Sequence, residues 1–167
     1  MNFMKKGAYQ ITDSYVGIGI AVALLIFVVW VGTSLLNKKK QVQDTIAYTS
    51  ILNEVRTMKG LNGYGTIDYV PALIDSKNLS GVTIDGNSIK NKSGGVITVV
   101  GNVTGVILTT NSLSKSDCIK AASVLSTSGT ATTSINGTSQ SGEVLEPTAQ
   151  TLCADSNTNT VAAITNS

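Results

Sequence analysis

The chain has 167 residues, with 12 basic and 10 acidic side chains and a formal net charge of +2. This length allows one modest domain with an appendage, and the near balance of charge argues against a nucleic-acid-binding protein, which needs a concentrated basic face. The sequence has no histidine, which excludes Ser-His and Cys-His nucleophile pairs, histidine metal ligands and a histidine pH switch.

An apolar stretch near the N-terminus is the first predicted element. The sequence from Tyr15 to Leu36 is uncharged, and about 20 apolar residues are enough for a helix to cross a bilayer. The stretch ends in Asn37 and a run of lysines at 38–40. A secretory signal peptide is the alternative, but its apolar core is shorter and ends in a small-x-small cleavage site. We therefore predict a retained transmembrane helix over about residues 15–36.

The charges around this stretch leave its orientation open. Lys5 and Lys6 precede it and the lysines at 38–40 follow it, so a count by the positive-inside rule slightly favours a cytoplasmic C-terminal part. The pair Cys118 and Cys153, and a remainder rich in Ser, Thr, Asn and Gly, favour export instead. We expect export.

Asp13 lies at the N-terminal edge of the apolar stretch. An unpaired carboxylate is costly there and usually has a function. One interpretation is an N-cap or first-turn acid at the membrane interface. The other is an acid that pairs with a cation from another subunit.

The basic leader, Gly7, the short segment ending in Asp13 and the long apolar stretch together resemble a type IV prepilin. In that family a prepilin peptidase cuts after a glycine and methylates the new N-terminal amine. The family's acid pairs with that amine on a neighbouring subunit, and the helix packs in the filament core. The resemblance implies cleavage between Gly7 and Ala8, methylation of Ala8, and an assembly salt bridge made by Asp13.

The cleavage bond has two candidates. The acid is aspartate where the family usually has glutamate, and it is the sixth mature residue if Ala8 is the first. It is the fifth, as in the family, if the cut follows Ala8 and Tyr9 is the first. Met4 is an alternative start of the leader.

An amphipathic segment follows the lysines. Apolar residues recur there with the spacing of one helix face, namely Tyr48, Ile51, Leu52, Val55 and Met58. Gly60 follows as a helix stop, and no proline interrupts residues 8–59. We therefore predict one long helix over residues 8–59. A membrane-anchored coiled-coil dimer is an alternative, although the stripe covers few turns.

Residues 60–167 form the predicted globular head. We expect a short helix that starts near Pro71, with Ala72, Leu73 and Ile74 partly buried, and a short strand or loop over residues 81–89. A Gly94-Gly95 turn leads into a β-branched strand over residues 96–100. A turn at 102–104 leads into an antiparallel strand over residues 105–111.

The C-terminal third begins with a predicted helix that ends near Leu125. Ser114 and Asp117 have the spacing of a capping box, and one face carries the apolar set Cys118, Ala121, Ala122 and Leu125. The polar segment 126–147 follows, with Ile135 and Val144 as strand markers, and a final strand is predicted over residues 159–166. The Gly-Gly and Asn-Gly pairs predict hairpin turns, and no Walker or dinucleotide motif is present.

The chain has two cysteines, Cys118 and Cys153. An even number in an exported domain predicts one disulfide, and two free buried thiols in a reducing compartment are the alternative. A bridge would close a loop of about 35 residues and stabilise the head by about 4 kcal/mol in the loop-entropy model.

The order of these elements resembles the type IVb pilins, which include thin-pilus pilins of conjugative plasmids and bundle-forming and toxin-coregulated pilins. The similarity depends mainly on SGGVITV, KSDCIKAASVL and the Cys118–Cys153 span. It implies an α+β class and the type IV pilin fold: a long N-terminal helix packs by its C-terminal half against a small antiparallel sheet with short helices and one disulfide. In that family the disulfide bounds a region exposed on the filament.

The resemblance also implies a function. Residues 1–7 would be a cleaved leader, and the chain would be the major subunit of a pilus used for conjugation or adhesion. Its partners would be other copies in a helical homopolymer, the bacterial inner membrane, the prepilin peptidase, an assembly ATPase with its platform, minor pilins and a recipient or host surface. The precursor would reside in the inner membrane and the mature form in an extracellular filament.

We expect no enzymatic activity, since no nucleophile and base constellation is evident, and no cofactor, metal or nucleic acid. A minor pilin, a secretion-system pseudopilin and a bitopic membrane-anchored binding domain are the alternatives.

Overall fold

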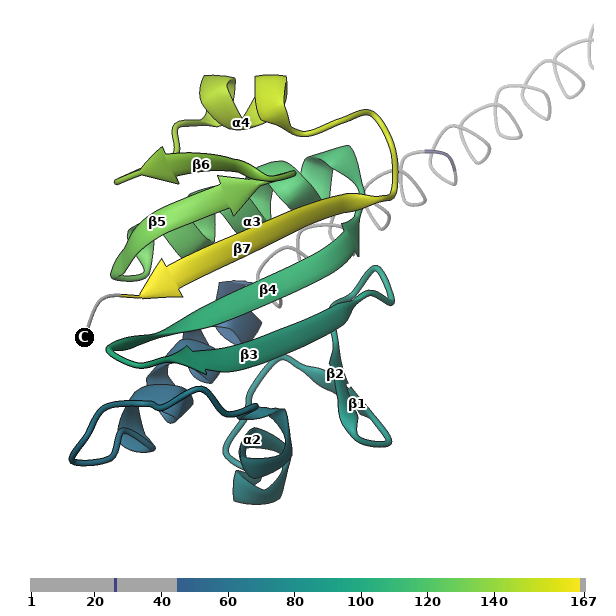
Figure 1. Cartoon of the computed structure of the whole chain (residues 1–167). Helices are drawn as coiled ribbons and strands as arrows, with labels where there is room; N and C mark the ends of the chain where they lie inside the picture. The colour runs from purple at the N-terminus through teal and green to yellow at the C-terminus, as the bar shows by residue number, and fades with distance from the viewer. Residues whose placement is uncertain (1–25, 27–44, 166–167) are drawn as a thin grey trace, which may run out of the picture. The chain divides into compact units, whose positions relative to one another are not determined.

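The computed structural model describes residue 26 and residues 45–165 (Figure 1). Residues 45–57 are helical and are followed by α2 (Val70–Ser76), β1 (Thr83–Asp85), β2 (Ser88–Lys90), β3 (Val96–Asn102), β4 (Gly105–Leu113), α3 (Lys115–Thr127), β5 (Thr130–Ile135), β6 (Thr138–Ser141), α4 (Glu146–Leu152) and β7 (Asn159–Thr165). Among the described residues, no helix has both the length and the apolar character needed to cross a membrane. The predicted leader, and the predicted transmembrane stretch apart from Ile26, lie outside the described residues.

The strands of the described part form one seven-stranded sheet in the order β1-β2-β3-β4-β7-β5-β6. Every neighbouring pair is antiparallel. The last strand in sequence, β7, lies between β4 and β5 (Figure 1), so that Ala163 is opposite Leu108 on one side and Thr133 on the other. The C-terminal strand therefore unites the two halves of the sheet.

The helix over residues 45–57 packs its apolar stripe against this sheet (Figure 1). Tyr48, Ile51, Leu52 and Val55 are at most 2% exposed and belong to the same core as the inward side chains of β3 and β4. The Tyr48 hydroxyl lies 3.3 Å from the Thr110 hydroxyl of β4. The predicted stripe is confirmed. The helix ends before Met58, which is half-buried.

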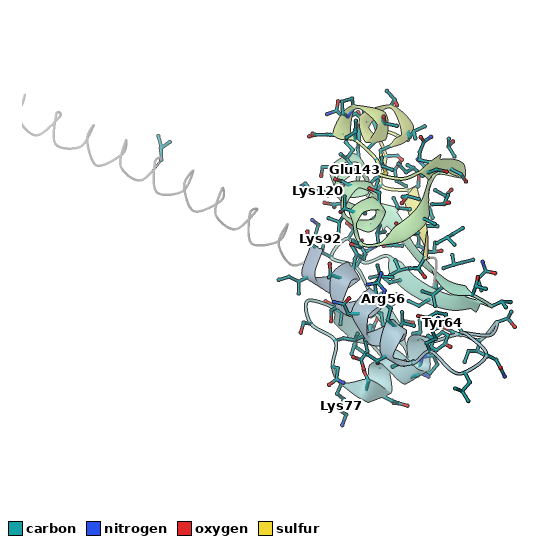
Figure 2. All side chains as sticks on the ribbon, turned by 90° about the vertical axis from the view of Figure 1, so that its left-hand side faces the viewer. Arg56, Tyr64, Lys77, Lys92, Lys120 and Glu143 are labelled. Atoms are coloured by element: carbon teal, nitrogen blue, oxygen red, sulfur yellow. A yellow bond between two sulfur atoms is a disulfide. The ribbon has the colours of Figure 1, made fainter. Side chains whose placement is uncertain are left out.

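A second helix, α3, packs on the sheet beside β5 and β7 and is joined to the first by Arg56 (Figures 1 and 2). The Arg56 guanidinium donates to the carbonyl oxygen of Ser128 at 2.8 Å, and Ser128 is the C-cap residue of α3. A cation at a helix C-terminus is stabilised by the helix dipole. Arg56 therefore joins the N-terminal helix of the head to the end of α3.

Several predicted elements are confirmed. The strands at 96–100 and 105–111 are β3 and β4, each with alternating burial over much of its length, and the final strand is β7. The first turn of α3 has the predicted cap, since the Ser114 hydroxyl accepts from the Asp117 N–H. Its predicted apolar face, Cys118, Ala121, Ala122 and Leu125, is buried. The chain is an α+β protein.

Three expectations differ from the structure. Residues 81–89, expected to be one short strand or a loop, contain β1 and the first two residues of β2, so this segment forms most of a hairpin and not a single strand. Ala72 is exposed, because α2 directs only Val70 and Leu73 into the core. Val144 is buried but lies outside any strand, and residues directly after it form the unpredicted helix α4.

Candidate functional site

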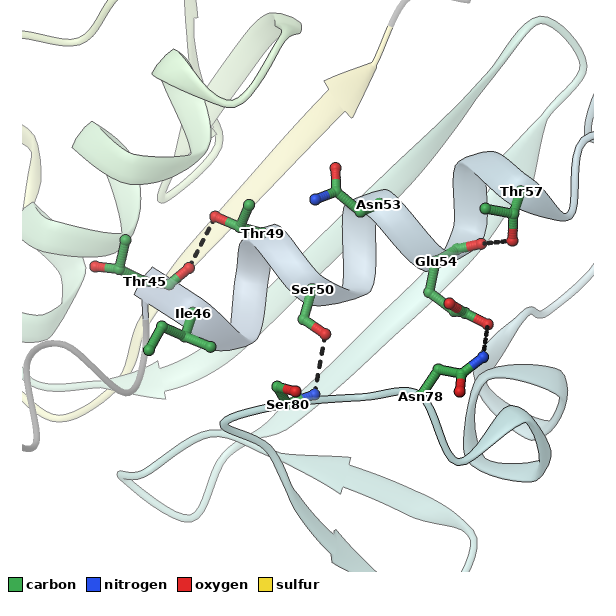
Figure 3. Close-up of a pocket in the computed structure, with 9 residues that line it drawn as sticks. All are labelled: Thr45, Ile46, Thr49, Ser50, Asn53, Glu54, Thr57, Asn78 and Ser80. Carbon is green, nitrogen blue, oxygen red and sulfur yellow. Dashed lines mark hydrogen bonds between the residues drawn. The ribbon is translucent and has the colours of Figure 1, made fainter.

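The exposed side of the helix over residues 45–57 lines a groove, closed on its other side by the loop after α2 (Figure 3). We call it the helix groove. Its volume is about 530 Å³ and its lining residues are Thr45, Ile46, Thr49, Ser50, Asn53, Glu54, Thr57, Asn78 and Ser80.

Two hydrogen bonds hold the loop against the helix (Figure 3). The Ser50 hydroxyl accepts from the Ser80 N–H at 2.9 Å, and the Glu54 carboxylate accepts from the Asn78 amide at 3.2 Å. Eight of the nine residues that line the helix groove carry a polar group, and the ninth is Ile46, which is 46% exposed. This surface is suited to contact with another macromolecule, since it presents hydroxyl and amide groups around one apolar side chain.

A disulfide defines the second candidate region. Cys118 of α3 is bonded to Cys153, the C-cap residue of α4, with the two Cα atoms 6.0 Å apart. Both cysteines are buried. The bond encloses β5, β6 and α4, and we call residues 118–153 the disulfide-bounded region.

Two asparagines join the turn between β5 and β6 to the start of β7. The buried Asn159 side chain donates to the carbonyl oxygens of Leu113, Ala154 and Ser156 at 3.0 Å each. Its oxygen accepts from the Asn136 amide at 2.8 Å. Sequence reasoning missed both roles; the Asn136-Gly137 pair signalled only the turn between β5 and β6, where both residues have positive φ.

An ion pair stabilises the start of α3. Lys92 Nζ lies 2.8 Å from Asp117 Oδ1, and the hydroxyls of Ser114 and Ser93 donate to Asp117 Oδ2 at 2.8 and 2.9 Å. Burial acts to raise the pKa of Asp117. The hydrogen bonds from Lys92, Ser114 and Ser93 and the charge of Lys92 outweigh this effect, so the pKa lies below its ordinary 3.8.

We expect Asp117→Asn to lower the free energy of unfolding by about 1 kcal/mol at pH 7. A carboxylate whose pKa is lowered by folding stabilises the folded state at pH values above its unfolded pKa. This contribution to the free energy of unfolding disappears as the pH falls through the folded pKa. The difference in stability between the two proteins should therefore shrink as the pH falls below 3.8, the ordinary pKa of this group. Urea unfolding between pH 2 and 7 measures the difference, with Asp155→Asn as an exposed control. A difference that stays constant with pH would contradict the role of the charge.

The sequence-predicted site residues fall into two groups. Cys118 and Cys153 form the bond described above. Gly7, Ala8, Tyr9 and Asp13 lie outside the described residues. Among the described residues, no group of three or more His, Cys, Asp or Glu side chains could hold a metal ion.

Comparison with known proteins identifies the family. The family model described as PilS N terminal matches residues 38–166, well over half of the chain. The chain belongs to the PilS family. No curated protein matches the sequence.

A solved structure agrees with this membership. The crystal structure of a type IV b pilin from Salmonella typhi is similar with a TM-score of 0.57 and 25% sequence identity, over 78% of this chain and 99% of that one. The predicted type IVb pilin class and type IV pilin fold are therefore confirmed. This PilS family chain is a pilin subunit, and pilins are structural subunits.

Proposed function

We propose that the chain is the major subunit of a type IVb pilus, an extracellular filament for conjugation or adhesion. One observation carries this proposal. The helix over residues 45–57 buries its apolar stripe in the head and presents the helix groove on its other side. The helix therefore holds the head to the preceding chain and still offers a surface to neighbouring subunits.

The preceding residues supply the rest of the proposal. The apolar stretch at 15–36 holds the precursor in the inner membrane and then packs against equivalent helices in the filament core. A prepilin peptidase removes residues 1–7, and an assembly ATPase with its membrane platform moves the mature subunit into the growing polymer. Minor pilins and a recipient or host surface complete the set of partners.

Gly7→Glu is expected to abolish processing, because the peptidase needs a small residue before the scissile bond. The measurement is the shift in electrophoretic mobility from precursor to mature chain in cells that contain the peptidase. N-terminal sequencing of the wild-type product distinguishes Ala8 from Tyr9 as the first residue and detects its methylation. Normal processing of the variant, or an unprocessed wild type, would contradict the proposal.

Asp13→Ala is expected to leave membrane insertion intact and to reduce filament yield strongly, because the N-terminal amine of a neighbour loses its anionic partner. Asp13→Glu is the matched control and should retain filaments, since it keeps the charge. Membrane fractionation and the amount of pilin sheared from cells are the two measurements. A normal filament yield from Asp13→Ala would contradict the proposed pairing of Asp13 with the N-terminal amine of a neighbouring subunit.

The sheared fraction also separates the major subunit from its alternatives. A major pilin should be the most abundant protein of the sheared filaments. A trace amount there would favour a minor pilin or a secretion-system pseudopilin. A chain that functions normally in cells without prepilin peptidase would favour a bitopic membrane-anchored binding domain.

A further inference from the structure

Exposed apolar side chains gather at one end of the head. In the described part of the chain, eight large apolar side chains are exposed, and half of them lie in the loop after the first helix or at the end of β3. These are Leu61, Ile67, Val100 and Val103, with exposed fractions of 105%, 59%, 39% and 56%. Single exposed apolar residues are common, but a cluster marks an interaction site. We call this cluster the apolar platform.

Close backbone contacts join the two segments of the platform. The Tyr64 N–H donates to the Val103 carbonyl at 2.9 Å, the Val103 N–H donates to the Gly65 carbonyl at 2.8 Å, and the Gly101 N–H donates to the Ile67 carbonyl at 2.9 Å. A Cβ on Gly101 would lie 2.6 Å from the Tyr64 carbonyl oxygen, so the close approach requires glycine. The platform is therefore held in one arrangement before it meets a partner.

Val103 occupies an unfavourable backbone conformation. Asn102 pairs with Gly105, so the turn between β3 and β4 contains only Val103 and Thr104, and Val103 has a φ of 47°. A β-branched residue is rare at positive φ, where glycine or asparagine is preferred. Folding alone would favour either of those residues. Strain of this kind together with an exposed apolar side chain points to a function outside the isolated subunit.

We propose that the apolar platform of one subunit docks into the helix groove of a second copy. This inference depends on the proposed function, because it needs a polymer of this chain. Such a contact is heterologous: it joins two different surfaces of the same chain, and repetition of a contact of this kind builds an open helical filament.

The groove is a suitable receptor for two reasons. Its exposed Ile46 lies near the start of the helix and Leu61 lies in the loop after its end, so about 16 Å of helix separates the two surfaces at 1.5 Å per residue. In subunits whose helices pack in parallel with an axial stagger, the platform of one therefore lies beside the groove of the next. The charges also match, since the exposed Lys59 stands beside the platform and Glu54 lines the groove.

The decisive variant is Val103→Asn in the full chain. It should stabilise the subunit and weaken the polymer, two effects of opposite sign. We expect thermal unfolding in detergent to shift upward by about 3 °C, because asparagine tolerates positive φ. We expect filament yield to fall about tenfold or more, because each interface loses an apolar anchor.

Leu145→Asn is the matched control. Leu145 is also exposed and apolar, and it is the N-cap residue of α4, a position that favours asparagine. This variant should keep its filaments. Unchanged filament yield in Val103→Asn, or an equal loss in both variants, would overturn the inference. If the wild-type chain forms no filaments, the proposed function fails instead.

Cross-linking identifies the receptor surface. We expect p-benzoylphenylalanine in place of Leu61 to cross-link, in assembled filaments, to a peptide of the neighbouring subunit that contains Ile46. Cross-links to the sheet, to the disulfide-bounded region or to no pilin at all would overturn the inference. The inference would also be overturned if Val103→Asn gave a normal filament yield but the filaments no longer attached to a recipient cell. The platform would then bind the surface of that cell.

Discussion

Removal of the disulfide by Cys118→Ala with Cys153→Ala is expected to lower the free energy of unfolding by about 4 kcal/mol. The two residues are 35 positions apart in sequence, and the bond limits the freedom of that loop in the unfolded chain. A loss of this size is a large fraction of the 5–15 kcal/mol that typically stabilises a domain.

The effect should be measured on the full chain by urea unfolding. Wild-type protein treated with a thiol reductant during unfolding should approach the stability of the double variant, and reductant should not change the double variant. A loss below about 1 kcal/mol would mean that packing alone holds the region. In that case the pairing of β5 with β7 and the hydrogen bond between Asn136 and Asn159 would hold the region in the head.

The disulfide-bounded region is also where the sequence was least informative. β3 and β7 are rich in valine and isoleucine with alternating burial, so their local pattern indicated strands. β5 and β6 consist mainly of Thr, Ser and Gln, and only Ile135 signalled a strand there. These strands form because β5 pairs with the distant β7, a contact that no local pattern encodes.

The missed helix α4 has a similar explanation. Pro147 was included in a polar, turn-rich segment, yet proline is also favoured in the first turn of a helix, where it stands in α4. In α3 the pair Ser114 and Asp117 gave a cap signal, and the prediction succeeded. The seven residues of α4 have no side-chain cap, so the local signal was missing.

The candidate surfaces depended still more on the fold. The helix groove exists because Ser80 and Asn78 reach back to residues 30 and 24 positions earlier in the sequence. The platform exists because the loop at 64–67 pairs with the end of β3. The apolar stripe from Tyr48 to Val55 was visible in the sequence, because it has the helical period. The helix groove on the opposite side of that helix was not visible in the sequence.

That buried stripe leads to the second large effect. Leu52→Ala is expected to lower the free energy of unfolding by about 3 kcal/mol, because Leu52 is fully buried between the helix and the sheet and its truncation leaves a cavity. Ile46→Ala on the same helix is the control. Its side chain is exposed, so its effect on unfolding should stay within about 0.5 kcal/mol.

The pair of variants separates folding from assembly. Leu52→Ala weakens the attachment of the head to the helix that follows the apolar stretch, so it should reduce both the stability of the subunit and the yield of filaments. Ile46→Ala should leave urea unfolding unchanged and reduce only the yield, because Ile46 lies in the receptor groove. If Leu52→Ala were no less stable than Ile46→Ala, the helix would not be anchored by its buried stripe, and the observation that carries the proposed function would be lost.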